Sequence, residues 1–425
     1  MSAQHVEDRG LLRFLTCGSV DDGKSTLIGR LLFDTKTILA DTLSAIERTS
    51  SKRGMTAVDL SLLTDGLQAE REQGITIDVA YRYFSTGTRK YIIADAPGHE
   101  QYTRNMVTAA STANLAIILI DARKGVLTQT RRHSYLAKLV GIPHLIVAVN
   151  KMDLVDYDQA TFERIVADYK EFAAQLGIQD MRFIPLSALN GDMVVDRGES
   201  LNWYEGPTLI EILEQAPAAQ TEQAESFRFP VQFVCRPHAS DNPELHDYRG
   251  FMGRVEAGEI KVGDSVTVLP NGLTSKVKDI QLYGQSLDKA IHEQSVTLLL
   301  EDEIDTSRGD MIVASDEVPA QTKQIEATVC WLSETPLSPA RTYWLRHTTR
   351  EVKAKVASIA HRIDINALTQ ESATTLAMND IAQLTLKLAQ PIFADKYTDS
   401  RATGAFILID ESTNNTVGAG MITGV

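Results

Sequence analysis

The sequence predicts an α/β domain, built on a mostly parallel sheet with helices on both faces, followed by two small antiparallel β-barrels. Two patterns carry this prediction. As far as about residue 220, near-continuous β-branched runs of strand length alternate with helical patterns, which is typical of a parallel sheet buried on both sides. Beyond that point helical periods are scarce, and short strands follow one another with Gly or Asn turns, which is typical of small barrels.

Breaks in these patterns predict the domain boundaries. We expect the first domain to span residues 1–220, the first barrel 221–320 and the second barrel 321–425. The piece "APAAQTEQAES", which begins at Ala216, is small, polar and featureless and is interpreted as a linker. The second boundary lies near "SDEVPAQTK".

Each strand of the first domain is predicted from an apolar run, and each helix from the periodic pattern that follows it. In chain order these pairs are "LLRFLTC" and "STLIGRLL", "KYIIADA" and "YTRNMVTAAS", "LAIILIDA" and "TQTRRHSYLAKLVG", "HLIVAVN" and "TFERIVADYKEFAAQLG", and "MRFIPLSA" and "TLIEILEQA". Strands of the barrels are expected in "FRFPVQFVC", "YRGFMGRVEAG", "DSVTVLPNGLTSKVKDIQLYG", "VTLLLED", "QIEATVCWL", "ARTYWLRHT", "VKAKVASIAHRID", "IAQLTLKLAQPI" and "GAFILID".

Composition excludes several classes of protein. The formal net charge of −14 opposes broad electrostatic binding to nucleic acid, which requires clustered Lys and Arg. No apolar run approaches the length that crosses a bilayer, so no membrane partner is expected. The N-terminus lacks the pattern of a secretory signal, and Cys17, Cys235 and Cys330 form neither a disulfide framework nor a zinc site. We therefore expect a cytoplasmic protein whose cysteines are core residues.

The stretch "GSVDDGKST" fits a phosphate-binding loop between a strand and a helix. Glycines let the backbone wrap a polyphosphate, whose charge also meets the N-terminus of the helix. Lys24 would reach the β- and γ-phosphates, and Ser25 would ligate Mg²⁺. The alternative is a glycine-rich turn with a surface lysine, and the motif alone does not separate kinases, ATPases and GTPases. The predicted loop residues are Gly18, Ser19, Val20, Asp21, Asp22, Gly23, Lys24, Ser25 and Thr26.

Two later strand ends favour a guanine base. In "NKMD", Asp153 would accept the adjacent N1–H and N2–H donors of guanine together, a pair that adenine lacks. Asn150 would tie neighbouring loops to the base, and "SAL" would supply a backbone N–H to the guanine O6. Each motif alone is weak, but all of them follow predicted strands, at whose carboxyl ends ligands bind in open parallel sheets. The predicted base-binding residues are Asn150, Lys151, Met152, Asp153, Ser187, Ala188 and Leu189.

The segment "DAPGH" ends another predicted strand, at the place where a γ-phosphate would lie. Asp95 would hold Mg²⁺ through water, the Gly98 N–H would sense the γ-phosphate, and His99 follows where the attacking water is positioned. Upstream, Thr76 in "EREQGITID" would complete the Mg²⁺ shell while the γ-phosphate is present. The alternatives are a structural histidine and an ordinary threonine at a strand entry. The nucleotide-binding residues predicted here are Asp95, Ala96, Pro97, Gly98 and His99.

Together these motifs resemble those of the elongation-factor-like GTPases, typified by elongation factor Tu. The resemblance spans essentially the whole chain and includes "VDDGKSTL", "DAPGHEQYTRNMVTAAS" and, in the first barrel, "GRVEAGEIKVGDSVTVLP". Within that superfamily the sequence resembles the GTPase (large) subunit family of the heterodimeric bacterial sulfate adenylyltransferase, or ATP sulfurylase. The distinguishing features are Asp22, where translation factors generally have His, and the segments "LLTDGLQAEREQGITID" and "YTRNMVTAASTANLAIILIDARKGVLTQTRRHS".

The resemblance implies a P-loop GTPase domain with GTP and Mg²⁺ as cofactors. It implies that Ser25 and Thr76 ligate the metal, with Asp95 one water molecule away. It also implies three catalytic residues. These are His99, which would orient the attacking water, Val20, which would gate that histidine, and Lys24.

In the sulfate-activating branch, the resemblance implies a complex that forms adenosine 5'-phosphosulfate and pyrophosphate from ATP and sulfate, an uphill reaction that GTP hydrolysis drives. The chain contains no HxGH, no SGGxDS-type loop and no second phosphate loop. The sulfate chemistry is therefore expected on a partner, a catalytic small subunit with a PP-loop ATP site, in a heterodimer. The sequence stops at "AGMITGV", so no fused adenylyl-sulfate kinase is expected.

Two other functions stay open at this point. A translational elongation factor would deliver aminoacyl-tRNA, although the acidic charge and Asp22 weigh against it, and a GTP-dependent assembly scaffold would make no product of its own. The polar loop Arg236–Gly250 is a candidate for contact with the switch segments or the partner, or an ordinary solvated loop. Trp344 is expected in the core of the second barrel.

Overall fold

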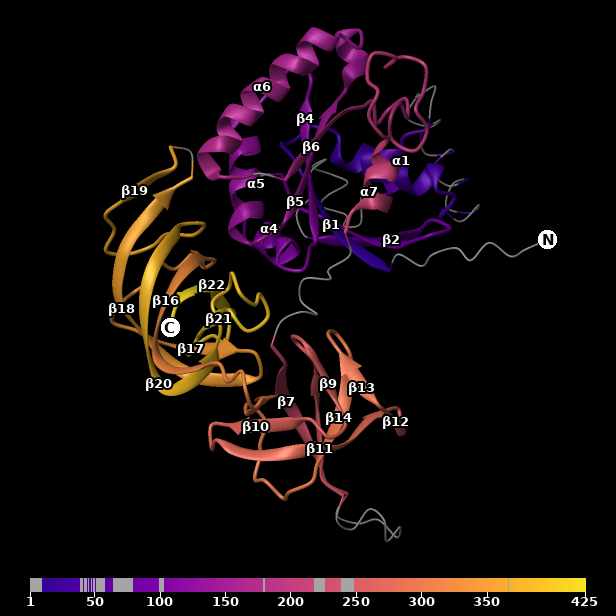
Figure 1. Cartoon of the computed structure of the whole chain (residues 1–425). Coiled ribbons are helices and arrows are strands. Elements are labelled where there is room, and N and C mark those ends of the chain that lie inside the picture. Colours follow the sequence, from indigo (N-terminus) through magenta and orange to yellow (C-terminus); the bar gives the residue numbers. More distant parts are fainter. Residues whose placement is uncertain are drawn as a thin grey trace, which may run out of the picture. The chain divides into compact units, whose positions relative to one another are not determined.

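The computed structural model describes residues 10–38, 58–63, 79–98, 103–178, 180–217, 226–237, 248–365 and 367–425, together with residues 41, 44, 46, 48 and 50. The chain forms two compact units, Met1–Ala218 and Ala219–Val425, which are shown in Figure 1. Among the described helices, none has the length and apolar character needed to span a membrane.

A six-stranded sheet forms the centre of the first unit, in the order β2-β3-β1-β4-β5-β6. The strands from β3 to β6 are parallel, and β2 is antiparallel to β3. Strand β4 is buried along its whole length, as the apolar run "LAIILID" predicts. The strands are β1 (Leu11–Cys17), β2 (Ala80–Ser85), β3 (Lys90–Asp95), β4 (Leu115–Asp121), β5 (His144–Asn150) and β6 (Met181–Pro185).

Helices cover both faces of this sheet. Figure 1 shows α1 and α7 on one side and α4, α5 and α6 on the other. Helix α6 begins after Asp158, whose side chain accepts the Thr161 N–H at 2.8 Å, and ends at Gly177 in the left-handed conformation. The helices are α1 (Lys24–Asp34), η1 (Leu60–Leu63), α4 (Thr103–Ala110), α5 (Thr128–Leu139), η3 (Met152–Val155), α6 (Gln159–Leu176) and α7 (Leu209–Gln215).

The order of the strands places a binding edge at the end of β1. Strand β3 lies on one side of β1 and β4 on the other, so the chain order reverses at β1. In open α/β sheets, ligands bind outside the carboxyl ends of the strands at such a point. The segment that leaves β1 here is Gly18–Gly23, followed by α1, whose buried face contains the predicted apolar residues Leu27, Ile28, Leu31 and Leu32.

The second unit consists of two closed antiparallel barrels, which confirms the predicted fold class. The first barrel closes through β10-β15-β7-β8-β14-β11 and the pairing of β11 with β10. Its strands are β7 (Arg228–Cys235), β8 (Gly250–Arg254), β10 (Ser265–Leu269), β11 (Leu273–Leu282), β14 (Ser295–Leu300) and β15 (Met311–Ala314). In the same part of the chain, β12 (Gln285–Leu287) pairs with β11, and β9 (Glu259–Lys261) and β13 (Lys289–Ile291) form a separate two-stranded sheet.

The second barrel closes through β17-β21-β22-β16-β20-β18 and the pairing of β18 with β17. Its core is apolar, with Trp331 the largest fully buried side chain of the described residues. Its strands are β16 (Ala320–Trp331), β17 (Thr342–His347), β18 (Arg350–Asp364), β19 (Thr369–Glu371), β20 (Ile381–Ala394), β21 (Ala405–Asp410) and β22 (Thr416–Gly424).

The two barrels are joined by a buried ion pair and an apolar cluster. Arg228 of the first barrel donates to both carboxylate oxygens of Asp395 in the second, from Nε at 2.9 Å and Nη2 at 3.0 Å. Phe393 packs beside them against residues of the first barrel. Bidentate arginine–carboxylate geometry fixes orientation as well as distance, so this contact sets how the barrels lie on each other. The apolar cluster consists of Leu269, Met311, Val313 and Phe393.

Several details differ from the sequence analysis. The barrel strands β15 and β22 and the short strands β9, β12, β13 and β19 were not among the expected elements. Strand β2 was also not among the expected elements, because only Phe84 in it is buried and its other residues are exposed or half-buried, so it forms no continuous apolar run. Trp344 is only half-buried, since its neighbours Tyr343 and Leu345 point into the barrel and alternate residues of a strand face opposite sides. Cys235, at the end of β7, is also half-buried rather than a core residue. Residues 238–247 of the polar loop Arg236–Gly250 lie outside the described residues.

Candidate nucleotide-binding site

The phosphate loop, Gly18–Gly23, has the close packing that its glycines predict. Gly23 has a φ of +92°, a conformation that side chains other than glycine rarely adopt. A Cβ atom on Gly23 would also lie 2.4 Å from the side-chain nitrogen of Asn150. Glycine is therefore required at this position both for its backbone conformation and for the space it leaves to the Asn150 side chain.

Asp22 closes the phosphate loop from inside. The Ser19 N–H donates to Asp22 Oδ2 at 2.6 Å, and the Asp22 N–H donates to the Ser19 carbonyl at 3.2 Å. Asp22 is 1% exposed, and its other carboxylate oxygen is buried without a hydrogen-bond partner. Burial raises the pKa of this carboxyl to about 6. Asp22, the residue that distinguishes the sequence from translation factors, is thus buried and holds the phosphate loop together through its hydrogen bonds with Ser19.

Lys24, the first residue of α1, is held by the same loop. Its ammonium donates to the Gly18 carbonyl at 2.9 Å and to the Ser19 carbonyl at 3.1 Å. Burial lowers its pKa, while the negative charges of Asp95 and Asp22 act in the opposite direction. The amino group of Lys24 is therefore fixed in a water-poor environment, where the attraction of a protonated lysine for a phosphate is stronger than at the surface.

The loop that follows β3 lies directly against the phosphate loop. A Cβ atom on Gly98 would lie 2.5 Å from the Gly18 carbonyl oxygen and 2.7 Å from the Lys24 ammonium. Only glycine lets the backbone approach this closely. Asp95, at the end of β3, is 2% exposed, and the Thr16 hydroxyl is 3.4 Å from its carboxylate. The structure thus brings the two predicted phosphate-reading segments together.

Asn150 joins the phosphate loop to the base loop, Ser187–Leu189. Its side-chain N–H donates to the Asp22 carbonyl at 2.8 Å, and its side-chain oxygen accepts the Ala188 N–H at 3.0 Å. Asn150 is 1% exposed, so both bonds are shielded from water. Asn150 thus connects the two loops, one of them through a bond between residues 128 apart in the chain, and its contact with a base stays a prediction.

The base-binding side of the site is held by side chains from three loops. The Ser187 hydroxyl donates to Asp153 at 2.7 Å, which orients the carboxylate predicted to bind guanine. Lys151 forms an ion pair with Asp121 at 3.2 Å and donates to the Asp21 carbonyl. Its stem therefore crosses from the "NKMD" segment to the phosphate loop.

Two supporting residues were not predicted from the sequence. Burial acts to raise the pKa of Asp121, but hydrogen bonds from Arg123 and Lys151 outweigh it and lower the pKa to about 2. Arg30 of α1 donates to the backbone carbonyls of the base loop. The position of Asp121 at the end of a buried strand was an available signal, because buried carboxylates require partners. Nothing in the sequence pattern marks Arg30.

The remaining predicted residues take various positions around this edge. Ser25 is half-buried in the first turn of α1, Met152 is buried, and Leu189 is 60% exposed. Thr76 and His99 lie outside the described residues, so their roles stay predictions. The predicted site residues that the structure describes are Gly18, Ser19, Val20, Asp21, Asp22, Gly23, Lys24, Ser25, Thr26, Asp95, Ala96, Pro97, Gly98, Asn150, Lys151, Met152, Asp153, Ser187, Ala188 and Leu189.

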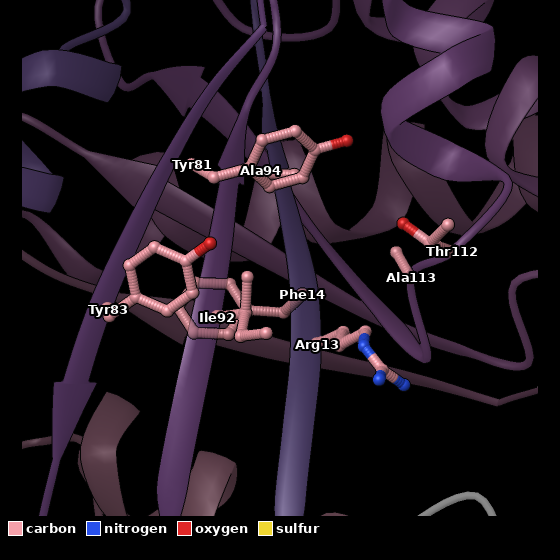
Figure 2. A pocket seen from close by; sticks show the side chains of 8 residues that line it. All are labelled: Arg13, Phe14, Tyr81, Tyr83, Ile92, Ala94, Thr112 and Ala113. Carbon is pink, nitrogen blue, oxygen red and sulfur yellow. The ribbon is translucent and has the colours of Figure 1, made fainter. Parts of the chain in front are cut away.

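A cavity of about 250 Å³ lies elsewhere on the sheet, as Figure 2 shows. Tyr81 and Tyr83 of β2 line it together with Arg13 of β1 and Ala113, which precedes β4. None of its lining residues belongs to the four loops of the candidate site. The cavity is therefore separate from the edge described above.

Comparison with known proteins gives the family. Residues 9–219 match the family described as elongation factor Tu GTP binding domain, and residues 324–423 match the one described as GTP-eEF1A C-terminal domain-like. Among solved structures, sup35 complexed with GMPPNP covers 99% of this chain and 96% of its own at a TM-score of 0.45 and 23% identity, a likeness that adds nothing to the assignment.

Curated relatives are much more similar. Sulfate adenylyltransferase subunit 1 from Cellvibrio japonicus (strain Ueda107) is 57% identical, over 99% of this chain and 88% of the relative. The protein of the same name from Saccharophagus degradans (strain 2-40) is 55% identical over the same shares. The chain therefore belongs to the sulfate adenylyltransferase subunit 1 family and has the GTPase domain of the elongation factor Tu type.

Proposed function

We propose that this chain is the GTP-hydrolysing subunit of a sulfate adenylyltransferase. In this proposal, GTP hydrolysis drives the formation of adenosine 5'-phosphosulfate and pyrophosphate from ATP and sulfate on a partner catalytic subunit. The observation that carries the nucleotide part is the Asn150 bridge, which connects the phosphate loop and the base loop through bonds of 2.8 and 3.0 Å. The sulfate part is supported by the relatives named sulfate adenylyltransferase subunit 1.

We assign the triphosphate of GTP to the loops after β1 and β3, and the guanine to those after β5 and β6. The first assignment is supported by the short distance between Gly98 and Lys24, because it places the backbone of the loop after β3 beside the Lys24 ammonium. The second is supported by Asp153, whose carboxylate is oriented by Ser187 and would accept the two guanine donors. An adenine nucleotide would not offer that carboxylate the pair of N–H donors that guanine offers, so the hydrogen bonds that favour guanine would be lost.

The donor set of the site fits Mg²⁺. This ion prefers oxygen ligands and keeps several waters. Ser25 offers a hydroxyl at the start of α1, and Asp95 offers a carboxylate at the end of β3 that would bind through water. Thr76 would supply a second hydroxyl. When bound, Mg²⁺ would neutralise charge on the β- and γ-phosphates.

In the hydrolysis of GTP to GDP and phosphate, Lys24 would stabilise negative charge that develops on the transferred phosphoryl group. This role is supported by the position of the Lys24 ammonium, which two carbonyls of the phosphate loop hold in place before the reaction. We assign the orientation of the attacking water to His99 and the gating of that histidine to Val20, as the resemblance implies.

The partner in this proposal is a small subunit with a PP-loop ATP site. The relatives carry the name subunit 1, which implies a further subunit in their enzymes. Coupling requires that the nucleotide state of this chain and the state of the partner's site bias each other. Loss of the γ-phosphate would be transmitted through the segments around Thr76 and His99.

Reconstitution with a purified small subunit tests the proposal. We expect the chain alone to hydrolyse GTP without forming adenosine 5'-phosphosulfate, and the pair to form it in the presence of GTP but not with a non-hydrolysable analogue. Product made by the single chain would contradict the division of labour. Preference for adenine nucleotides in calorimetry would contradict the nucleotide assignment. Tight, salt-sensitive binding of aminoacyl-tRNA would instead favour a translation factor.

We also propose the domain division 1–220, 221–320 and 321–425. The division of the described chain into compact units at Ala218 and Ala219 supports the first boundary. The separate closure of the two barrels supports the second.

A further inference from the structure

Arg30 connects the helix that follows the phosphate loop to the base loop. It lies on α1, and its Nε donates to the Ala188 carbonyl at 3.2 Å while Nη2 donates to the Leu189 carbonyl. The side chain is 18% exposed and passes over Gly191, where a Cβ atom would lie 3.5 Å from its Cδ. The planar guanidinium thus holds two successive carbonyls of a loop that is far away in the sequence.

The other backbone donors of the base loop are already engaged. The Ser187 N–H donates to the Asp192 carbonyl at 3.1 Å, and the Ala188 N–H donates to Asn150 at 3.0 Å. The next N–H along the chain, that of Asn190, donates to the Ser187 hydroxyl at 3.2 Å. None of these bonds uses the Leu189 N–H, which leaves this N–H of the loop available to a base oxygen.

The direction of the Leu189 N–H is set by the carbonyl of Ala188. Both groups belong to one trans peptide, in which the N–H and C=O point in opposite directions. Because Arg30 holds the Ala188 carbonyl toward α1, the Leu189 N–H points away from α1. The Leu189 side chain is 60% exposed, so its packing contributes little to holding this peptide in place.

We propose that Arg30 is a positioning residue for guanine recognition, which holds the Ala188–Leu189 peptide so that the Leu189 N–H meets the guanine O6. This inference rests on the proposed binding of a guanine nucleotide. A merely structural role of Arg30 would weaken all contacts of the base together. A positioning role would weaken the contact with O6 and leave the contact of Asp153 with the 2-amino group unchanged.

Base analogues separate these two roles in the full-length chain. The 6-thio analogue of GDP replaces O6 by a poorer acceptor, and inosine diphosphate lacks the 2-amino group. In the wild-type protein we expect the 6-thio analogue to bind about fivefold more weakly than GDP, the value of one neutral hydrogen bond. In Arg30→Met we expect GDP to bind about tenfold more weakly, and the ratio between GDP and the 6-thio analogue to fall toward one. The ratio between GDP and inosine diphosphate should stay as in wild type.

Two further variants complete the experiment. Arg30→Lys keeps one cationic donor and should recover part of the discrimination against the 6-thio analogue. Arg164→Met, at an exposed arginine of α6, should change none of the ratios. The proposal would be overturned if Arg30→Met lowered the GDP/6-thio ratio and the GDP/inosine diphosphate ratio equally, or if it left the 6-thio ratio unchanged. It would also be overturned if the wild-type protein did not discriminate against the 6-thio analogue. A wild-type protein without preference for GDP over ADP would contradict the proposed function instead.

Discussion

Asp22 is a carboxyl group buried in a loop whose proposed ligand is an anion. It is 1% exposed, one of its oxygens has no hydrogen-bond partner, and Lys24 and Lys124 are the cations that act on it. Attraction by these lysines lowers its pKa, but burial has the larger effect, so the pKa rises from 3.8 to about 6. The folded chain therefore binds this proton more tightly than the unfolded chain does, and ionisation of Asp22 costs folding free energy.

This cost predicts a pH-dependent gain on replacing Asp22 by asparagine. Since the folded pKa lies above the unfolded value, stability decreases as the pH rises from 3.8 to about 6, and the full cost of about 3 kcal/mol remains above that range. Asparagine keeps an oxygen for the Ser19 N–H and carries no charge. We expect Asp22→Asn to raise the free energy of unfolding of the nucleotide-free protein by about 3 kcal/mol at pH 7.5 and about half as much at pH 5.

Urea unfolding at the two pH values measures this difference. Asp168→Asn, at an exposed position of α6, is the matched control and should change stability equally little at both. A gain for Asp22→Asn of the same size at pH 5 and pH 7.5 would show that the carboxyl does not titrate as described.

Replacing Lys24 is expected to change both the stability of the protein and its binding of GTP. Lys24 is 7% exposed, and two carbonyls of the phosphate loop hold its ammonium. Methionine fills similar space without a buried charge, so Lys24→Met should raise the free energy of unfolding of the nucleotide-free protein by about 1 kcal/mol or more. It should also weaken GTP binding by about a hundredfold, because a charge-assisted contact is lost. Thermal unfolding with and without GTP measures both effects, and a nucleotide-induced shift as large as that of wild type would contradict the assignment.

At the scale of single residues, the sequence predicted which side chains gather and missed what holds them. The glycine, lysine and asparagine positions were predictable because their roles depend on local backbone geometry and on the ends of strands. The bond from Arg30 to the Ala188 carbonyl joins residues 158 apart. Contacts of this kind depend on tertiary placement, which no local pattern specifies.

Among the elements, α1 is fixed against η1 by a glycine. A Cβ atom on Gly29 would lie 2.1 Å from the Leu60 carbonyl oxygen and 2.8 Å from its carbon. Glycine inside a helix ordinarily costs about 1 kcal/mol relative to alanine. Here the close approach of the η1 backbone outweighs that preference, because backbone atoms cannot move aside as the end of a side chain can.

We therefore expect Gly29→Ala to destabilise the protein by about 1 to 3 kcal/mol, against the helix propensity. The control is Gly87→Ala in the turn between β2 and β3, where a Cβ atom would meet no atom within 4 Å. Denaturant unfolding of the two variants gives the comparison. A Gly29→Ala variant more stable than wild type would mean that η1 does not press on α1 in solution.

The elements that the sequence predicted are those with a strong period. Strand β4 and helix α6 were predictable, because one is a continuous apolar run and the other spans 18 residues between an aspartate cap and a glycine cap. Strand β2 was missed, since its exposed tyrosines give it no apolar face of its own. It forms because β3 offers a hydrogen-bonding edge, and this is a property of the sheet rather than of the segment.

For the molecule as a whole, the change from alternating strand and helix patterns to short strands with Gly or Asn turns predicted two barrels after an α/β domain. The closure of both barrels agrees with this prediction. How one barrel contacts the other was not predictable. Arg228 and Asp395 are 167 residues apart, and nothing near either of them indicates a pair. Arg228 is 5% exposed, so its guanidinium would be costly to bury without that carboxylate.

This ion pair predicts strong coupling between the barrels. Burial acts to raise the pKa of Asp395, but bonds from Arg228 and Thr403 lower it below 3.8, so the stabilisation is present above that pH and is lost as the pH falls through the folded pKa. Arg228→Met should destabilise the barrel pair by about 3 to 5 kcal/mol at pH 7, because it leaves a partly buried carboxylate without its cation.

Adding Asp395→Asn should restore much of the loss caused by Arg228→Met, since the double variant buries no unpaired charge. Urea unfolding followed by the fluorescence of Trp331 and Trp344 measures the cycle. A Trp203→Phe background removes the tryptophan of the first unit from the signal. If the two substitutions simply added, the barrels would be held by their other contacts, which include the apolar cluster around Phe393 and the ion pair between Arg350 and Asp310. A positive coupling that disappears on acidification would instead identify the ion pair as the contact that fixes one barrel on the other.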